Sequence, residues 1–211
     1  MKKYALLIAL AFGINTACAE TTPLDASIVK LQHEWATANY QTPKNDRENA
    51  LEKLSKEAHQ VTTSNPGRTE PLIWEGIITS TLAKYQGIFS QGGTAKAARD
   101  LLLAAEKIDP NALDGSALTS LGSLYYKVPS FLFGDHKKAR EYLERSLKIN
   151  PNGIDQNYFY ADFLFDEGEY AKSLEYFKKA LNAPPRPGRE DADAGRKADI
   201  QEGIKKAEKK L

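Results

Sequence analysis

The sequence predicts an all-α fold, a solenoid of helical hairpins followed by a C-terminal capping helix. Three observations support this prediction. Apolar residues recur at helical spacing, signals for β-strands are nearly absent, and the helical pattern stops four times at a proline. Proline lacks a backbone donor and disfavours helix at the residue before it, so each one ends a helix. Pro66, Pro110, Pro151 and Pro185 lie 44, 41 and 34 residues apart, which indicates an internal repeat.

Residues 1–19 predict a secretory signal peptide. Lys2 and Lys3 give a positive start, an apolar run extends from residue 4 to 14, and Ala17-Cys18-Ala19 supplies the small residues of a cleavage site. The run is shorter than the roughly 20 residues that a membrane-spanning helix needs. We therefore expect cleavage after Ala19 and a periplasmic location.

Cys18 supports an alternative interpretation, in which it is the lipidated first residue of a bacterial lipoprotein. Thr16 and Ala17 fit a lipoprotein signal, whereas Asn15 stands where such signals have an aliphatic residue. Attachment to a membrane is expected only in this case.

Residues 20–211 are expected to form one helical domain, because no low-complexity tract or charge block interrupts residues 24–183. Cleavage leaves 192 residues with 27 basic and 28 acidic side chains and no cysteine. This balance gives no electrostatic basis for binding nucleic acid. The missing cysteine excludes a disulfide and a thiolate metal site from the mature chain.

Small or apolar residues recur at the same distances before each proline. They stand five, eight and twelve residues before it, so offsets of three and four place them on one helix face. Small side chains on this face let a neighbouring helix approach closely. Each set of residues therefore indicates the second helix of a helical hairpin. The sets are Leu54, Ala58, Val61 and Pro66; Ala98, Leu102, Ala105 and Pro110; Ala139, Leu143, Ser146 and Pro151; and Ser173, Phe177, Ala180 and Pro185.

These sets place hairpins near residues 25–63, 69–107, 114–149 and 155–182. Asp114 and Asp155 are expected to cap first helices. The expected turns within three of the hairpins are Gly92-Gly93-Thr94, Gly134-Asp135 and Gly168-Glu169.

Residues 190–211 predict the capping helix. Ala194, Ala198 and Ile204 belong to a modest apolar stripe on a charged segment, and solenoids need a polar cap at their ends. The lysines at 205, 206, 209 and 210 fit a solvated face, with contact to an acidic partner or lipid headgroups as the alternative. Before this helix, Arg186-Pro187-Gly188-Arg189 predicts an extended basic turn.

The third and fourth hairpins resemble the tetratricopeptide repeat (TPR) family. The third has the family's Leu-Gly-x-x-Tyr pattern at Leu121, Gly122 and Tyr125, and the fourth has related residues at Tyr160, Ala161 and Leu164. The fourth departs from the family at Asn157, where a large residue is usual. The resemblance covers about residues 45–185 and implies a right-handed solenoid. With the export signal and irregular repeats, the chain also resembles the exported TPR component of tripartite (TRAP) transporters.

The resemblance implies a ligand or partner groove on the concave face, formed by first-helix positions off the core. Aromatic residues crowd into residues 125–177, more than interhelix packing alone accounts for. Aromatic and polar groups of this kind bind a protein, a peptide or a small organic ligand. The implied residues are Thr119, Ser123, Tyr126, Lys127, Tyr158, Asp162, Phe165 and Asp166.

The sequence shows no catalytic, cofactor-binding or metal-binding motif. His33, His59 and His136 have no suitably spaced partner, and the acidic cluster 162–169 fits a solvated edge. We therefore expect a non-catalytic exported scaffold, with a TRAP-associated accessory component as the specific hypothesis. The alternatives are a general cell-envelope assembly scaffold and a hydrolase that uses the acidic cluster. The sequence leaves the oligomeric state open.

The connection at 128–134 is unusually apolar. It either packs against the hairpins, which we expect, or exposes a patch for a partner or a bilayer surface.

We predict that the mature protein from its native host begins at Glu20 and contains no cysteine, which intact-mass spectrometry measures directly. Cys18→Ala should leave this mass unchanged, because the substituted residue is removed. A mature chain that begins at Cys18 and carries acyl groups would instead support the lipoprotein interpretation.

Overall fold

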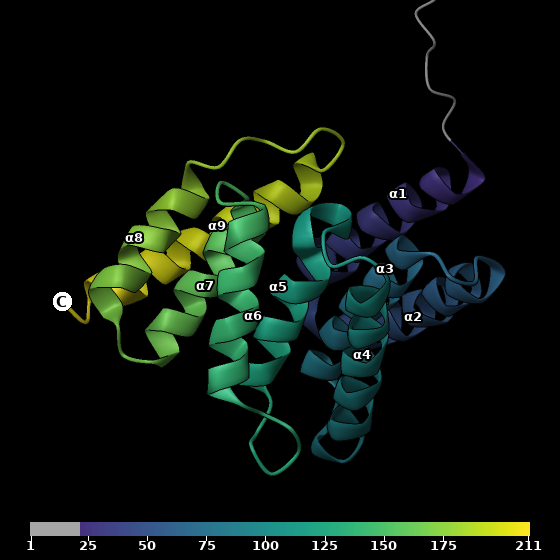
Figure 1. The fold of residues 1–211 in the computed structure, drawn as a ribbon, viewed down its shortest axis with the longest axis horizontal. Helices are drawn as coiled ribbons and strands as arrows, with labels where there is room; N and C mark the ends of the chain where they lie inside the picture. The colour runs from purple at the N-terminus through teal and green to yellow at the C-terminus, as the bar shows by residue number, and fades with distance from the viewer. Residues whose placement is uncertain (1–21) are drawn as a thin grey trace, which may run out of the picture.

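The computed structural model describes residues 22–211, and this part of the chain is helical and contains no strand (Figure 1). The predicted all-α fold is confirmed. The predicted signal peptide and Cys18 lie outside the described residues. None of the helices within 22–211 is long and apolar enough to cross a membrane.

The helices pair into antiparallel hairpins in chain order. The first two hairpins are α1 (Pro23–Ala36) with α2 (Arg47–Ser64), and α3 (Thr69–Tyr85) with α4 (Ile88–Ile108). A π-helical segment, η1 (Thr37–Gln41), and a short 3-10 segment, η2 (Lys44–Asp46), connect α1 to α2. The next two are α5 (Ala112–Lys127) with α6 (His136–Ile149), and α7 (Ile154–Asp166) with α8 (Tyr170–Leu181); the last helix is α9 (Glu190–Glu208).

The predicted packing positions of the second helices form the core. Leu102, Leu143 and Phe177 are buried, as are the small residues around them, while Val61 is only partly buried. Each large side chain meets a glycine or small residue across its hairpin. A Cβ at Gly122 would lie 2.6 Å from Leu143 Cγ, and one at Gly76 would lie 2.7 Å from Leu102 Cγ. The hairpins α3–α4 and α5–α6 therefore depend on a close helix approach that only a missing side chain permits.

The turn predicted at Gly92-Gly93-Thr94 is wrong. These residues lie inside α4, and the turn between α3 and α4 lies at Gln86 and Gly87. Gly92 has a packing role instead, because its ideal Cβ would lie 3.2 Å from a methyl group of Leu132.

The start of α5 has a left-handed backbone. Leu113, Asp114 and Gly115 have φ of 48°, 56° and 74°, so Asp114 does not act as the predicted N-cap. A left-handed non-glycine residue costs about 1–2 kcal/mol. Gln156 of α7 stabilises this turn by donating a hydrogen bond of 2.8 Å to the Asp114 carbonyl.

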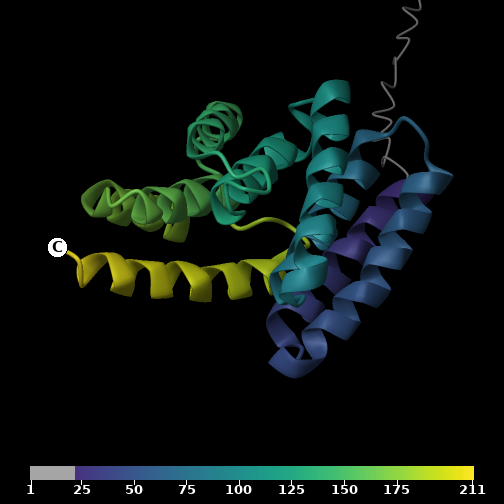
Figure 2. The same cartoon turned by 90° about the horizontal axis from the view of Figure 1, so that it is seen from below.

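Helix α9 packs on the last hairpin and also extends beyond it (Figure 2). Ile200 is buried, and Gly203 lies against the ring of Phe177. The amino-terminal half of α9 reaches α1, where His33 Nδ1 lies 2.9 Å from Asp191 Oδ2. The sequence did not predict this contact between the two ends of the solenoid. As a result, α9 covers part of the concave side.

We predict that Gly122→Ala destabilises the fold by about 1–3 kcal/mol, because the new methyl group overlaps Leu143 in a packed core. Chemical denaturation measures this loss.

The matched control is Gly93→Ala, which also adds one methyl group to a helix but has no atom within 4 Å of the new Cβ. It should stabilise by about 0.5–1 kcal/mol through helix propensity. Equal effects of the two substitutions would show that the close approach at Gly122 is unimportant.

Candidate binding cavity

A cavity of about 990 Å³ lies between the hairpins and α9. Helices α3, α5 and α7 supply inward-facing residues, α4 supplies residues of its first two turns, and the segment around α9 supplies three arginines. The described chain thus forms a half-open space on its concave side that is large enough for a small ligand.

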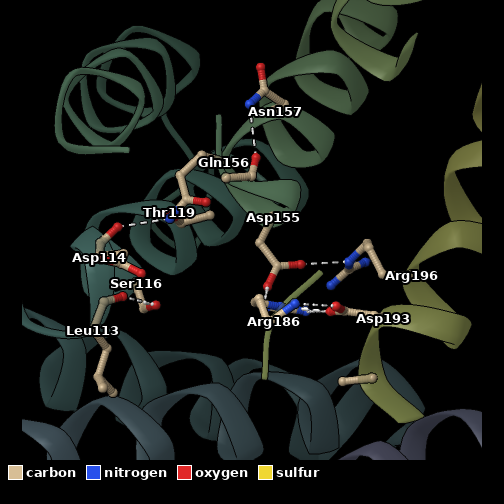
Figure 3. Close-up of polar contacts among 12 residues, drawn as sticks. Leu113, Asp114, Ser116, Thr119, Asp155, Gln156, Asn157, Arg186, Asp193 and Arg196 are labelled. Carbon is tan, nitrogen blue, oxygen red and sulfur yellow. Dashed lines mark hydrogen bonds and ion pairs between the residues drawn. The ribbon is translucent and has the colours of Figure 1, made fainter. Parts of the chain in front are cut away.

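Asp155 connects α7 to the C-terminal segment at one end of the cavity (Figure 3). Its two carboxylate oxygens accept hydrogen bonds from Arg196 Nε at 2.7 Å and Arg186 Nη1 at 2.6 Å. Arg186 also donates to Asp193 at 2.7 Å. Burial disfavours the charged carboxylate, but Arg196 and Arg186 outweigh this effect and hold the pKa of Asp155 well below its usual range. Asp155 therefore stays ionised and holds the start of α9 against α7.

Arg196 is buried by aromatic rings. Its guanidinium carbon lies 4.2 Å from the ring centre of Tyr158 and 4.8 Å from that of Phe159, both on α7. It also donates to Asp199 at 3.1 Å, and the Tyr40 hydroxyl donates to the same carboxylate at 3.1 Å. These contacts join η1, α7 and α9 into one cavity wall.

The structure places five of the eight groove residues implied by the resemblance on the cavity lining: Thr119, Ser123, Lys127, Tyr158 and Asp162.

The other three groove residues lie elsewhere. Tyr126 is buried behind Asp162 and donates a 2.7 Å hydrogen bond to it, and burial together with this carboxylate raises the pKa of Tyr126. Phe165 lines a separate, small pocket beside α9. Asp166 accepts a hydrogen bond from Lys127 Nζ at 2.9 Å.

The carboxylates of the 162–169 cluster each pair with cations. Asp162 and Asp166 both contact Lys127, at 3.0 and 2.9 Å. Burial disfavours the charged form of Lys127, but these two carboxylates outweigh it and raise its pKa. Glu167 and Glu169 both contact Arg140, at 3.6 and 2.7 Å. No group of three or more His, Cys, Asp or Glu side chains within 22–211 is arranged to hold a metal ion.

The sequence did not predict the tryptophans and the arginines of the cavity. Trp35 and Trp74 line it from the first two hairpins, and their rings pack edge to face, 6.1 Å apart. Arg186 and Arg189 belong to the predicted basic turn, which the structure places against the cavity. The two arginines that precede α9 were the available signal for a cationic site. Their position at the cavity depends on how α9 packs, which the local sequence does not determine.

The apolar connection 128–134 is divided between packing and exposure. Phe133 packs edge to face on Tyr125, with ring centres 6.0 Å apart, so part of the connection is packed as expected. Phe131 is 84% exposed and lies, with Leu132 and the fully exposed Phe89, along the cavity. These three residues form what we call the apolar rim.

Comparison with known proteins agrees with this architecture. Residues 131–152 and 157–187 match the sequence pattern of the tetratricopeptide repeat, over α6, α7 and α8. These two segments carry tetratricopeptide repeats. No curated protein sequence matches the chain.

The solved structures with similar folds include other TPR proteins. A thermophilic TPR protein of Thermus thermophilus superposes with a TM-score of 0.56 at 15% identity, covering 87% of this chain and 90% of that one. MamA from Desulfovibrio magneticus RS-1 has a TM-score of 0.46 at 16% identity, covering 85% and 96% of the two chains. At such identities the likeness shows the fold alone. TPR folds generally serve as scaffolds that bind protein partners.

We predict that Asp155→Asn lowers the free energy of unfolding by about 3 kcal/mol at pH 7, because Arg186 and the buried Arg196 lose the carboxylate that they share. The folded-state pKa of Asp155 is depressed, so its contribution is present above about pH 4 and is lost as pH falls below that value. Denaturation at pH 7 and pH 3 should therefore show a smaller acid-induced loss in Asp155→Asn than in the native chain.

Asp100→Asn is the control, because Asp100 forms a surface ion pair with Arg99 and its side chain is 64% exposed. It should cost under about 1 kcal/mol. A similar cost for both variants would contradict a central role for Asp155.

Proposed function

We propose that this chain is an exported, non-catalytic binding protein whose ligand occupies the cavity on its concave side. The observation that carries the proposal is the half-open cavity of about 990 Å³, bounded by the first helices of three hairpins and by α9. Open TPR solenoids present a groove, whereas here α9 turns the groove into a cavity.

The cavity volume limits the occupant. Ligand pockets commonly measure about 300–1,000 Å³, so this space suits a small organic molecule or a short segment of a peptide. A folded domain does not fit inside it. A protein partner would therefore insert one extended segment or bind the outer surface.

The acidic cluster supports binding rather than hydrolysis. Asp162 and Asp166 share Lys127, and Tyr126 donates to Asp162, so both carboxylates hold α5 against α7. A general base must be able to reach the proton it removes. Alanine at Asp162 and Asp166 separates the two functions: loss of turnover would support an enzyme, and loss of ligand retention alone supports a binding protein.

The export signal and irregular repeats support a specific role as an accessory component of a TRAP-type transport system. In this role, the cavity would hold a transported ligand, or a segment of a transporter subunit. Purification from the native periplasm tests the association, and failure to retain any transporter subunit or substrate would count against it.

A general cell-envelope assembly scaffold is the second candidate. The observation that favours it is the apolar rim of Phe89, Phe131 and Leu132, which exposes large apolar side chains. Exposed apolar patches of this kind mark protein interaction sites.

We predict that Ser123→Trp abolishes ligand retention, because Ser123 lines the cavity from α5 and the indole ring would fill part of it. Native mass spectrometry of protein purified from its own host measures the retained mass.

Thr63→Trp is the control, since Thr63 is exposed on α2 and does not line the cavity. It should retain the same mass as the native chain. Equal retention by the two variants, or no retained mass in the native chain, would contradict the proposed function.

A further inference from the structure

Arg189 differs from the other two arginines at the cavity. Arg186 and Arg196 each contact two carboxylates, whereas Arg189 forms no ion pair with any residue of 22–211. Its Nε is buried and has no hydrogen-bond partner in the described chain. Burial and the nearby Arg186 lower the pKa of Arg189. Arg189 is partly buried, and a buried donor without an acceptor is costly, so its Nε lacks the acceptor that would satisfy it.

Trp74 provides a second unpartnered donor at the same place. The guanidinium carbon of Arg189 lies 5.0 Å from the ring centre of Trp74, and both residues line the cavity. Trp74 is only 4% exposed, and its indole N–H has no acceptor within the described residues. Buried polar groups in native proteins are normally hydrogen-bonded. Two adjacent donors that lack acceptors indicate a site for an anion.

The net charge of the lining supports an anion as well. Six cations line the cavity, against the three carboxylates Asp155, Asp162 and Asp199. Lys84 and Lys96 add to Arg189 as cations that form no ion pair with residues of 22–211. The six cations are Lys84, Lys96, Lys127, Arg186, Arg189 and Arg196.

The opposite end of the cavity carries the apolar rim, and Lys84 and Lys127, near the ends of α3 and α5, lie toward the same end. Trp74, Ser116 and Asp155 lie near the starts of α3, α5 and α7, while Val128 and the apolar rim lie beyond the end of α5 or at the start of α4. At 1.5 Å per residue, Ser116 and Val128 are separated by about 18 Å along α5. The cavity thus has the unpartnered donors of Arg189 and Trp74 at one end and the apolar rim at the other, and the separation accommodates an extended chain of about ten carbons together with its head group.

We infer that the cavity binds an amphipathic organic anion, with its charged head at Arg189 and Trp74 and its apolar chain directed toward Phe131, Leu132 and Phe89. The inference rests on the proposed function, since it names the chemistry of the ligand in that cavity. The head is a carboxylate or a phosphate, because either offers the acceptors that the guanidinium and indole donors lack.

The test uses ligands that share a ten-carbon chain and differ in the head. Decanoate and decyl phosphate carry the two anionic heads, and decyltrimethylammonium carries a cation; all are used below the concentration at which they form micelles. Both tryptophans of the chain line the cavity, so their fluorescence reports binding. We expect at least one anion to bind, and at least tenfold more tightly than the cation.

The variants test each end of the cavity. Arg189→Gln should weaken binding of the anion about ten- to hundredfold, because a charge-assisted hydrogen bond is lost. Phe131→Ser should weaken decanoate binding but not change the preference for an anionic head, since Phe131 is an exposed loop residue. Arg68→Gln is the matched control, because Arg68 pairs with Glu70 outside the cavity and should leave affinity unchanged.

Thermal unfolding separates loss of the site from loss of the fold. Without ligand, Arg189→Gln should unfold at the native temperature or above it, because it removes a partly buried charge that forms no ion pair with residues of 22–211. If the unfolding temperature of Arg189→Gln is far below that of the native chain, Trp74→Phe tests the same site. This substitution keeps an aromatic ring and removes only the donor.

The inference fails if decyltrimethylammonium binds as tightly as the anions, if neither anion binds, or if Arg189→Gln and Trp74→Phe both retain native affinity for the anions. If the native chain retains a neutral or cationic molecule that Ser123→Trp excludes, the inference is wrong and the proposed function stands. If Ser123→Trp changes no retained mass, the proposed function fails by itself.

Discussion

The pairing of one carboxylate with two arginines holds the concave side of this molecule together. Asp155 lies in the first turn of α7, and its partners Arg186 and Arg196 stand 31 and 41 residues later in the chain. An ion pair between partly buried groups contributes to a fold only where the remaining hydrogen-bonding capacity is satisfied. Asp193, Asp199 and Tyr40 meet that need. The cavity exists because these contacts draw α9 back over the repeats.

The repeats themselves obey a simpler rule. Where one helix carries Gly76 or Gly122, the facing helix carries Leu102 or Leu143, and the pair lets two backbones approach. This local packing shapes each hairpin but says little about how the ends of the array meet. The inner faces of α3, α5 and α7 are released from core packing and line the cavity with Ser, Thr, Lys and aromatic side chains. On each of these helices, one face therefore packs within the hairpin and another face lines the cavity.

The sequence predicted those properties that depend on local spacing. The proline stops and the offsets of Leu102, Leu143 and Phe177 located the hairpins, because helical periodicity acts over a few residues. The resemblance to the repeat family implied Thr119, Ser123, Lys127, Tyr158 and Asp162, and these residues line the cavity. Tyr126 turned inward toward Asp162, and Gly92 served packing against Leu132 in place of a turn. Arg189 and Trp74 were missed because they meet only when α9 folds back, and long-range ion pairs determine that path.

The contact between α1 and α9 also changes how the array is expected to fold. Solenoids generally unfold repeat by repeat, since each unit touches only its neighbours. Here the His33–Asp191 and Tyr40–Asp199 contacts join the first hairpin to the last helix. The first hairpin and α9 must therefore meet before either is fully stabilised, which raises the mean sequence separation of native contacts and slows folding. A linear array of repeats thus acquires the cooperativity of a closed ring.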